Sequence, residues 1–210
     1  MKKIIFVIIL FLGTLLASAQ DLSTLILSMP DNIIMGLETD QKLALSGKAT
    51  DTATVKVQTA IYDNIVRTAF NEDYIALKTS DAGTTQIKLL PLINDSKIIC
   101  VIKTVHGEIS DSQISFYTTK WIPIPQTNLL PPKSIDWFLK SGIDRNSQDY
   151  INATTVVDIL PIELSFKENG DNIIATFDIK GYLSERDYQN LQPFLNESPR
   201  VFQWDKISYK

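Results

Sequence analysis

Residues 84–121 read TTQIKLLPLINDSKIICVIKTVHGEISDSQISFYTTKW and decide the fold of this chain. The segment contains three runs rich in β-branched, aromatic and other apolar residues, separated by a polar break at residues 94–96 and by a loop at His106 and Gly107. Such runs between short polar breaks are typical of β-strands joined in hairpins. We therefore expect an antiparallel meander, against which the other elements pack. In its first run Gln86 and Lys88 alternate with Ile87 and Leu89, which predicts one face of that strand in water.

Upstream of the meander, residues 55–59, 61–70 and 74–79 also have the composition of strands. Residues 21–37 have apolar side chains at helical spacing, interrupted by Pro30, which predicts two short helices with the second starting at Asp31. Residues 42–54 are small and polar, and we expect a loop there.

Downstream, residues 121–132 (WIPIPQTNLLPP) contain four of the nine prolines and predict an extended connector. This connector is the predicted boundary between an N-terminal half (20–125) and a C-terminal half (126–210), with one continuous domain as the alternative. A short helix is expected over residues 134–140 and a polar loop over residues 144–152.

The C-terminal half has the clearest local patterns. Alternating residues from Ile162 and again from Ile173, with Asn169-Gly170 between them, predict a hairpin with one buried face. Ser184 three residues before Asp187 resembles a capping box for a helix over 185–191, and residues 200–209 predict a last strand. The predicted class is α+β, with antiparallel sheet and short helices packed on one side.

The two predicted halves share one short sequence similarity. Residues 89–92 (LLPL) and 159–162 (ILPI) each open a predicted hairpin. This suggests two similar halves, with chance convergence of hairpin chemistry as an equal alternative.

The N-terminus has the pattern of an export signal. Lys2 and Lys3 precede an apolar run from Ile4 to Leu16, and Ala17-Ser18-Ala19 supplies a cleavage site. The run is shorter than the about 20 residues that span a bilayer, and no stop-transfer pattern follows. We expect residues 1–19 to be removed, and the product to be periplasmic or on the cell surface. No cysteine lies near the cleavage site, so we expect no lipid anchor.

Charge and cysteine content narrow the function classes. The chain has 20 Lys and Arg against 24 Asp and Glu, and this acidic balance argues against a nucleic-acid partner. Cys100 is the one cysteine, so no internal disulfide can form. It lies in an apolar run, where cysteine behaves as a small buried hydrophobe and not as a nucleophile.

No pattern in the sequence indicates catalysis, a cofactor or a metal. His106 is the one histidine, and we expect it in a surface loop, too far along the strand from Cys100 to form a dyad with it. A metal site or a Ser-His-Asp triad needs further partners. The carboxylates fall mostly in predicted turns and helix starts, where solvated surface is the ordinary interpretation.

The sequence also suggests one binding site and one modification site. Trp121, Trp137 and Trp204 could form an aromatic patch for sugar or peptide, although so few aromatics more often fill a core. Thr52, within Asp51-Thr52-Ala53, resembles the acceptor of the protein O-glycosylation system of Bacteroidetes, with an ordinary loop as the alternative.

Short matches across nearly the whole mature chain carry a resemblance, namely residues 29–31 (MPD), 89–91 (LLP), 95–96 (DS), 99–104 (ICVIKT), 111–117 (DSQISFY), Trp121, 182–184 (YLS), 193–194 (PF) and Trp204. The chain is similar to a family of exported Bacteroidales proteins of unknown function. The resemblance implies no activity and no functional residues.

From these observations we expect a non-enzymatic binding or scaffolding module of the periplasm or cell surface, with an envelope protein or glycan as partner. The alternative is a hydrolase acting on glycan or peptide through carboxylates. A purely structural subunit of an envelope assembly is a third hypothesis.

Overall fold

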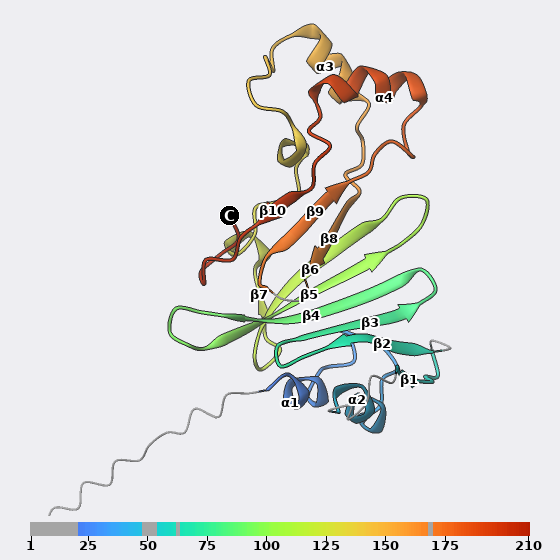
Figure 1. Ribbon diagram of the computed structural model, residues 1–210, viewed down its shortest axis with the longest axis vertical. Helices are drawn as coiled ribbons and strands as arrows, with labels where there is room; N and C mark the ends of the chain where they lie inside the picture. The colour runs from blue at the N-terminus through green and yellow to red at the C-terminus, as the bar shows by residue number, and fades with distance from the viewer. Residues whose placement is uncertain (1–20, 48–53, 62–63, 168–169) are drawn as a thin grey trace, which may run out of the picture.

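The computed structural model describes residues 21–47, 54–61, 64–167 and 170–210. The predicted signal (1–19) and Thr52 lie outside these ranges. The centre of the fold is a seven-stranded antiparallel sheet in which the strands follow one another in sequence order (Figure 1). Its strands are β1 (Val55–Val57), β2 (Ile65–Phe70), β3 (Tyr74–Ser80), β4 (Gly83–Pro91), β5 (Lys97–Val105), β6 (Asp111–Thr118) and β7 (Pro123–Ile124). The predicted meander is therefore confirmed, and its central strands are the longest in the molecule.

A second antiparallel sheet has the order β10-β9-β8, from β8 (Ile162–Phe166), β9 (Ile173–Phe177) and β10 (Arg200–Phe202). The predicted hairpin is confirmed, since Phe166 pairs with Ile173 and Ile162 with Phe177. Asn169 of the predicted Asn-Gly connection lies outside the described residues. The last strand ends at Phe202, and beyond it Trp204 and Tyr209 form an isolated bridge.

In the part of the chain that the structure describes, four short α-helices and three 3₁₀ turns complete the fold. They are α1 (Leu22–Leu27), α2 (Thr39–Ser46), α3 (Gln148–Thr155), α4 (Glu185–Leu191), η1 (Gln126–Asn128), η2 (Ile135–Phe138) and η3 (Gln192–Phe194). The α+β class is confirmed. At α4, the Ser184 hydroxyl accepts from the Asp187 backbone N–H and donates to its carboxylate, as the capping pattern predicted.

Three local predictions are wrong. The helix expected from Asp31 is a series of turns, and the expected loops at 42–54 and 144–152 contain most of α2 and the first half of α3. Both missed helices begin at caps that the apolar pattern does not show. Glu38 and Gln41 form a reciprocal capping box at α2, and the Ser147 hydroxyl caps α3.

The two faces of the seven-stranded sheet are covered by different layers. Helices α1 and α2 pack on one face, where Leu25, Ile26 and Leu45 meet Ile87 and other residues of the large sheet in a common core. The three-stranded sheet packs on the opposite face, where Leu164 and Phe202 join a second core. A third, smaller core joins α3 and α4 at the far end of the molecule.

Side chains of the large sheet accept hydrogen bonds from the backbone N–H groups along the outer edge of β8. The Asp111 carboxylate accepts from Ile162 N, the Ser112 hydroxyl from Leu164 N and the Gln86 amide oxygen from Phe166 N. An uncovered strand edge would leave these donors unpaired. The second core thus contains residues from both predicted halves. The boundary near residue 125 and the similarity of the halves stay predictions.

Strand β4 does not have the wet face that its alternating sequence suggested. Ile87 and Leu89 face the helix layer, whereas Lys88 and Leu90 lie under the three-stranded sheet, with the Lys88 side chain only 2% exposed. A strand covered on both faces needs no alternation, and here the second cover comes from a segment more than 70 residues further along the chain.

Candidate functional site

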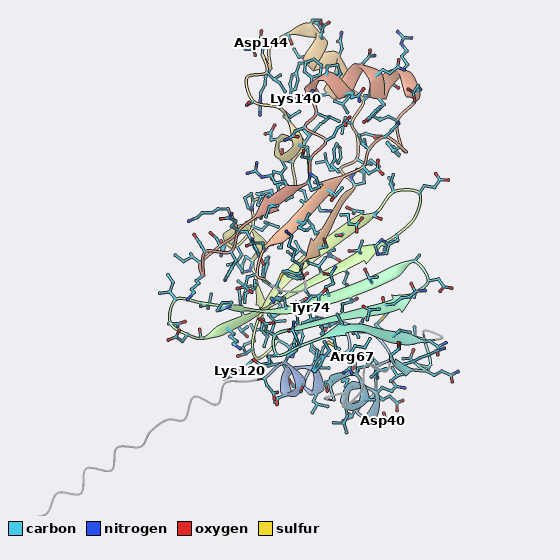
Figure 2. The ribbon with its side chains drawn as sticks, in the orientation of Figure 1. Asp40, Arg67, Tyr74, Lys120, Lys140 and Asp144 are labelled. Carbon is cyan, nitrogen blue, oxygen red and sulfur yellow. The ribbon has the colours of Figure 1, made fainter. Side chains whose placement is uncertain are left out.

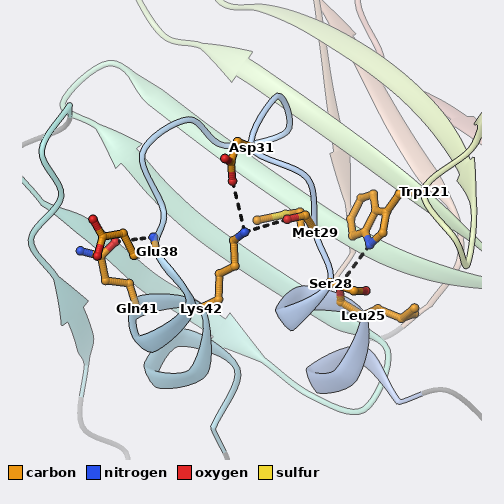
Figure 3. Close-up of polar contacts among 8 residues, drawn as sticks. All are labelled: Leu25, Ser28, Met29, Asp31, Glu38, Gln41, Lys42 and Trp121. Atoms are coloured by element: carbon orange, nitrogen blue, oxygen red, sulfur yellow. Dashed lines mark hydrogen bonds and ion pairs between the residues drawn. The ribbon is translucent and has the colours of Figure 1, made fainter.

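The three tryptophans do not form a common patch. Trp121 belongs to the core under the helix layer, and its indole N–H donates to Leu25 O at 3.1 Å (Figure 3). Trp137 and Trp204 lie on the opposite side of the large sheet. The Trp137 ring packs edge-on against Phe202 at 4.6 Å.

Trp204 lies beside Tyr209 and donates to Pro91 O at 2.7 Å. All three indoles thus pack within the fold, one on one face and two on the other.

The residues with nucleophilic or metal-binding chemistry lie apart. Cys100 is fully buried, and burial raises the pKa of its thiol well above the usual range. His106 is half-buried in its loop, with Nε2 3.0 Å from the Thr84 hydroxyl and Nδ1 3.2 Å from the Ser110 hydroxyl. Among the described residues, no three His, Cys, Asp or Glu side chains gather at a distance suited to one metal ion.

Two carboxylates converge on the buried Lys88. Its ammonium lies 3.1 Å from Asp73 and 3.7 Å from Asp171, above the ring of Tyr74. Burial raises the pKa of Asp171, an effect opposed by Lys88 and reinforced by the charge of Asp73. Since Asp73 precedes β3 and Asp171 precedes β9, this ion cluster ties the two sheets together. The sequence signal was a lysine within an apolar run, which alternation led us to place in water.

Polar side chains also anchor the helix layer (Figure 3). The buried ammonium of Lys42 donates to Met29 O at 2.7 Å and lies 3.4 Å from Asp31. The Arg67 guanidinium, which lies next to α2 in Figure 2, donates to Leu45 O and Gly47 O, both at 2.7 Å. These carbonyls at the end of α2 lack intrahelical partners, so Arg67 caps the helix.

A polar hollow of about 180 Å³ lies where the helix layer ends over the large sheet. We call it the β5–β6 hollow, and its lining residues are Asn32, Val101, Lys103, Gln113, Ser115 and Tyr117. The two strands form a regular grid, because Lys103 pairs with Gln113 and Val101 with Ser115. Asn32 comes from the turns that follow α1. Further across the sheet, Lys103 pairs with Thr85 and Thr85 pairs with Leu77, and both of these residues are buried under the helix layer.

Most polar side chains that line the β5–β6 hollow have no hydrogen-bond partner among the described residues. The side chains of Asn32, Gln113, Ser115 and Tyr117 make no hydrogen bond to another described residue. The Lys103 ammonium contacts Asn32 O at 3.4 Å, and partial burial lowers the pKa of this lysine. Sequence reasoning missed this site, because its residues alternate with buried ones as on any half-exposed strand.

Two other hollows contain charged groups that already have partners. One lies beside Asp31, Glu38 and Lys42, where the carboxylates cap α2 or pair with the lysine. The other lies beside Lys140 and Glu197 in the α3–α4 region. There the lysine donates to Pro193 O at 2.8 Å, and the hydrogen bonds from Gln192 and Tyr188 lower the pKa of Glu197.

Comparison with known proteins agrees with this fold. The structure is similar to that described as "Structure of a domain of an uncharacterized protein from Porphyromonas gingivalis W83", with a TM-score of 0.78 and 25% sequence identity. The similarity covers 90% of this chain and 96% of that chain. No curated protein matches the sequence. The family model described as "Protein of unknown function (DUF3256)" matches residues 14–209, and the chain therefore belongs to the DUF3256 family, in agreement with the expected family of unknown function.

Proposed function

We propose that the protein is an exported, non-enzymatic binding module of the periplasm or cell surface, and that the β5–β6 hollow is its ligand site. The observation that supports this is the set of polar side chains without partners around Lys103. Elsewhere the polar groups in the interior serve the packing of the layers, as Lys42, Arg67 and Lys88 do. Polar groups that converge without internal partners are what a ligand site offers. The partner we propose is an envelope glycan or protein.

The hydrolase alternative would use the carboxylates of Asp73 and Asp171. In glycosidases the two carboxyl groups flank the substrate bond. Here the Lys88 ammonium occupies the space between the two carboxylates, and it contacts both of them. This arrangement favours a role in joining the sheets.

Export is tested by fractionation of the producing bacterium. We expect the protein in the periplasmic or surface fraction, with Gln20 as its N-terminal residue. Over the described residues, no helix has both the length and the apolar character to cross a bilayer. Recovery of the uncleaved chain from the cytoplasm would contradict this part of the proposal.

The site is tested by filling it. Ser115→Arg places a long side chain in the hollow, and Thr176→Arg makes the same change at an exposed position of β9. Immobilised wild type and Thr176→Arg are expected to retain material from a solubilised envelope extract that Ser115→Arg does not retain, with polysaccharide and protein assayed separately. Equal retention by all three proteins, or none by the wild type, contradicts the proposed site. Equal melting temperatures of the three proteins control for folding.

A further inference from the structure

Lys103 differs from the buried lysines in having no anionic partner. Lys42 and Lys88 each lie within 4 Å of a carboxylate, and Lys133, which is half-buried, lies 2.6 Å from Asp111. Among the described residues, no carboxylate is within ion-pair distance of Lys103, whose contact is the carbonyl of Asn32 at 3.4 Å. Its ammonium has lost part of its hydration, since burial lowers its pKa. An anion bound beside it would restore the lost interaction.

Neutral hydrogen-bonding groups surround this cation. Gln113 is directly opposite Lys103 on the neighbouring strand, and Ser115 and Tyr117 follow on the same face of β6. Cross-strand neighbours lie about 5 Å apart and diagonal ones about 7 Å apart. An anion bound to Lys103 would therefore have amide and hydroxyl groups within about 7 Å of it. Asn32 borders the same space.

The lining selects among anions. One cation suits a monoanionic carboxylate, whereas phosphate sites generally combine several cationic groups or backbone N–H groups. Val101, the aliphatic residue of the lining, is itself buried and offers little apolar surface. An apolar acid would therefore gain little, while a ligand with several hydroxyls would satisfy Gln113 and Ser115. The volume of about 180 Å³ is below the about 300–1,000 Å³ of pockets for larger ligands, which indicates a single ring.

We propose that the β5–β6 hollow binds a sugar acid, a single pyranose-sized ring with a carboxylate that pairs with Lys103 and hydroxyls that bind Gln113 and Ser115. This inference rests on the proposed function and specifies the ligand of the same site. The tyrosine ring of Tyr117, held at 5.6 Å from Trp121, borders the hollow and can contact the C–H groups of such a ring.

The test uses three small probes with the purified protein, titrated by calorimetry and by NMR. Methyl β-glucuronide has the charge and the hydroxyls, methyl β-glucoside has the hydroxyls alone, and cyclohexanecarboxylate has the charge alone. The glucuronide is expected to bind at least about tenfold more tightly than either of the others, because charge-assisted hydrogen bonds are the stronger ones. Amide shifts should be confined to residues 101–103 and 113–117 and to Asn32. Equal binding of the neutral glycoside or of cyclohexanecarboxylate, or no binding of the glucuronide, overturns the inference.

Variants of two lysines on the same face of β5 test whether Lys103 is the cation that binds the carboxylate. Lys103→Met should weaken glucuronide binding about tenfold or more, and Lys103→Arg should retain most of it. Lys97→Met is the matched control, since Lys97 lies on the same strand and face at a distance of about 20 Å. Equal losses from Lys97→Met and Lys103→Met, or no loss from either, contradict the role of Lys103. Equal melting temperatures exclude a folding defect, and Ser115→Arg supplies a second variant that removes the site.

The two proposals fail in different ways. If Ser115→Arg abolishes retention of envelope material but the glucuronide does not bind, the sugar-acid inference is wrong and the proposed site stands. If Ser115→Arg leaves retention of envelope material unchanged, the proposed site itself is wrong.

Discussion

Two buried lysines hold the two layers of this molecule in different ways. On the helix side, Lys42 donates to a backbone carbonyl at 2.7 Å and lies 3.4 Å from Asp31, whose side chain is 83% exposed. Under the three-stranded sheet, Lys88 is paired with two half-buried carboxylates. Lys42 thus acts mainly as a hydrogen-bond donor to the backbone, and the carboxylate near it is in water, while Lys88 is an enclosed charge that depends on its two anions.

The two layers should therefore respond differently to mutation. Removal of the partners of an enclosed charge leaves it without compensation, which is among the most destabilising changes. Removal of a single donor leaves one buried carbonyl without a hydrogen bond and removes some packing, which is a smaller loss of stability. The helix layer has further anchors of the same kind in Arg67 and Trp121, and the small sheet has the side-chain bonds to the edge of β8.

The largest effect is expected when both carboxylates around Lys88 are removed. Asp73→Asn combined with Asp171→Asn leaves the ammonium buried and unpaired, and should lower the free energy of unfolding by about 3–5 kcal/mol. Urea denaturation measures the loss. Addition of Lys88→Met to the double variant should recover most of it, because methionine is apolar and similar in length. A loss of less than about 1 kcal/mol would mean that water reaches Lys88.

A smaller effect is expected at Lys42. Lys42→Met leaves Met29 O without its donor and should cost about 1–3 kcal/mol in the free energy of unfolding. Native-state hydrogen exchange should locate the change in α1, α2 and the turns between them. Faster exchange in β8 and β9 as well would show that the two layers are not independent.

Asp171 provides a pH-dependent test of the Lys88 cluster. Its pKa is raised in the folded protein, chiefly by burial, above the usual 3.8. At a pH between the pKa of Asp171 in the unfolded chain and its higher pKa in the folded protein, the folded protein binds more protons than the unfolded chain. In that pH range Asp171 therefore makes the free energy of unfolding fall as the pH rises. Asp171→Asn should remove this part of the pH dependence, as measured by urea midpoints across the acid range. At neutral pH it should cost less than Asp73→Asn, because Asp73 is the nearer partner of Lys88. The reverse order would assign the pairing to Asp171.

The smallest effect is expected at Asp31. Its long, exposed contact with Lys42 belongs to a class of ion pairs that contribute little. Asp31→Asn should leave the melting temperature unchanged within error at moderate salt. A clear decrease would show that Lys42 depends on its carboxylate as Lys88 does, and the contrast between the two layers would be lost.

Much of the local structure was readable from the sequence. The strands of the meander, the hairpin from Ile162 and the cap at Ser184 follow from period-two alternation and from side chains that bond to nearby backbone, and these depend on a few adjacent residues. The same reasoning missed α2 and half of α3, because each buries little apolar surface and begins at a cap. The pair Glu38 and Gln41 was the available signal for α2.

The candidate site was not readable. In the sequence Lys88 and Lys103 look alike, because each directly follows an isoleucine within a strand-forming run. Their environments differ because a distant segment covers one and the helix layer stops short of the other. The tryptophans show the same limit, since their composition suggested one patch and the sheet separates Trp121 from the other two.

Local periodicity and residue type were enough to predict the α+β class, the order of the central strands, the buried state of Cys100 and the resemblance to a family of unknown function. They were not enough to predict which polar side chains are enclosed with partners and which are left open. That outcome depends on which remote segment packs over each face of the sheet, and the hydration of a lysine is set by that cover and not by its neighbours in the chain.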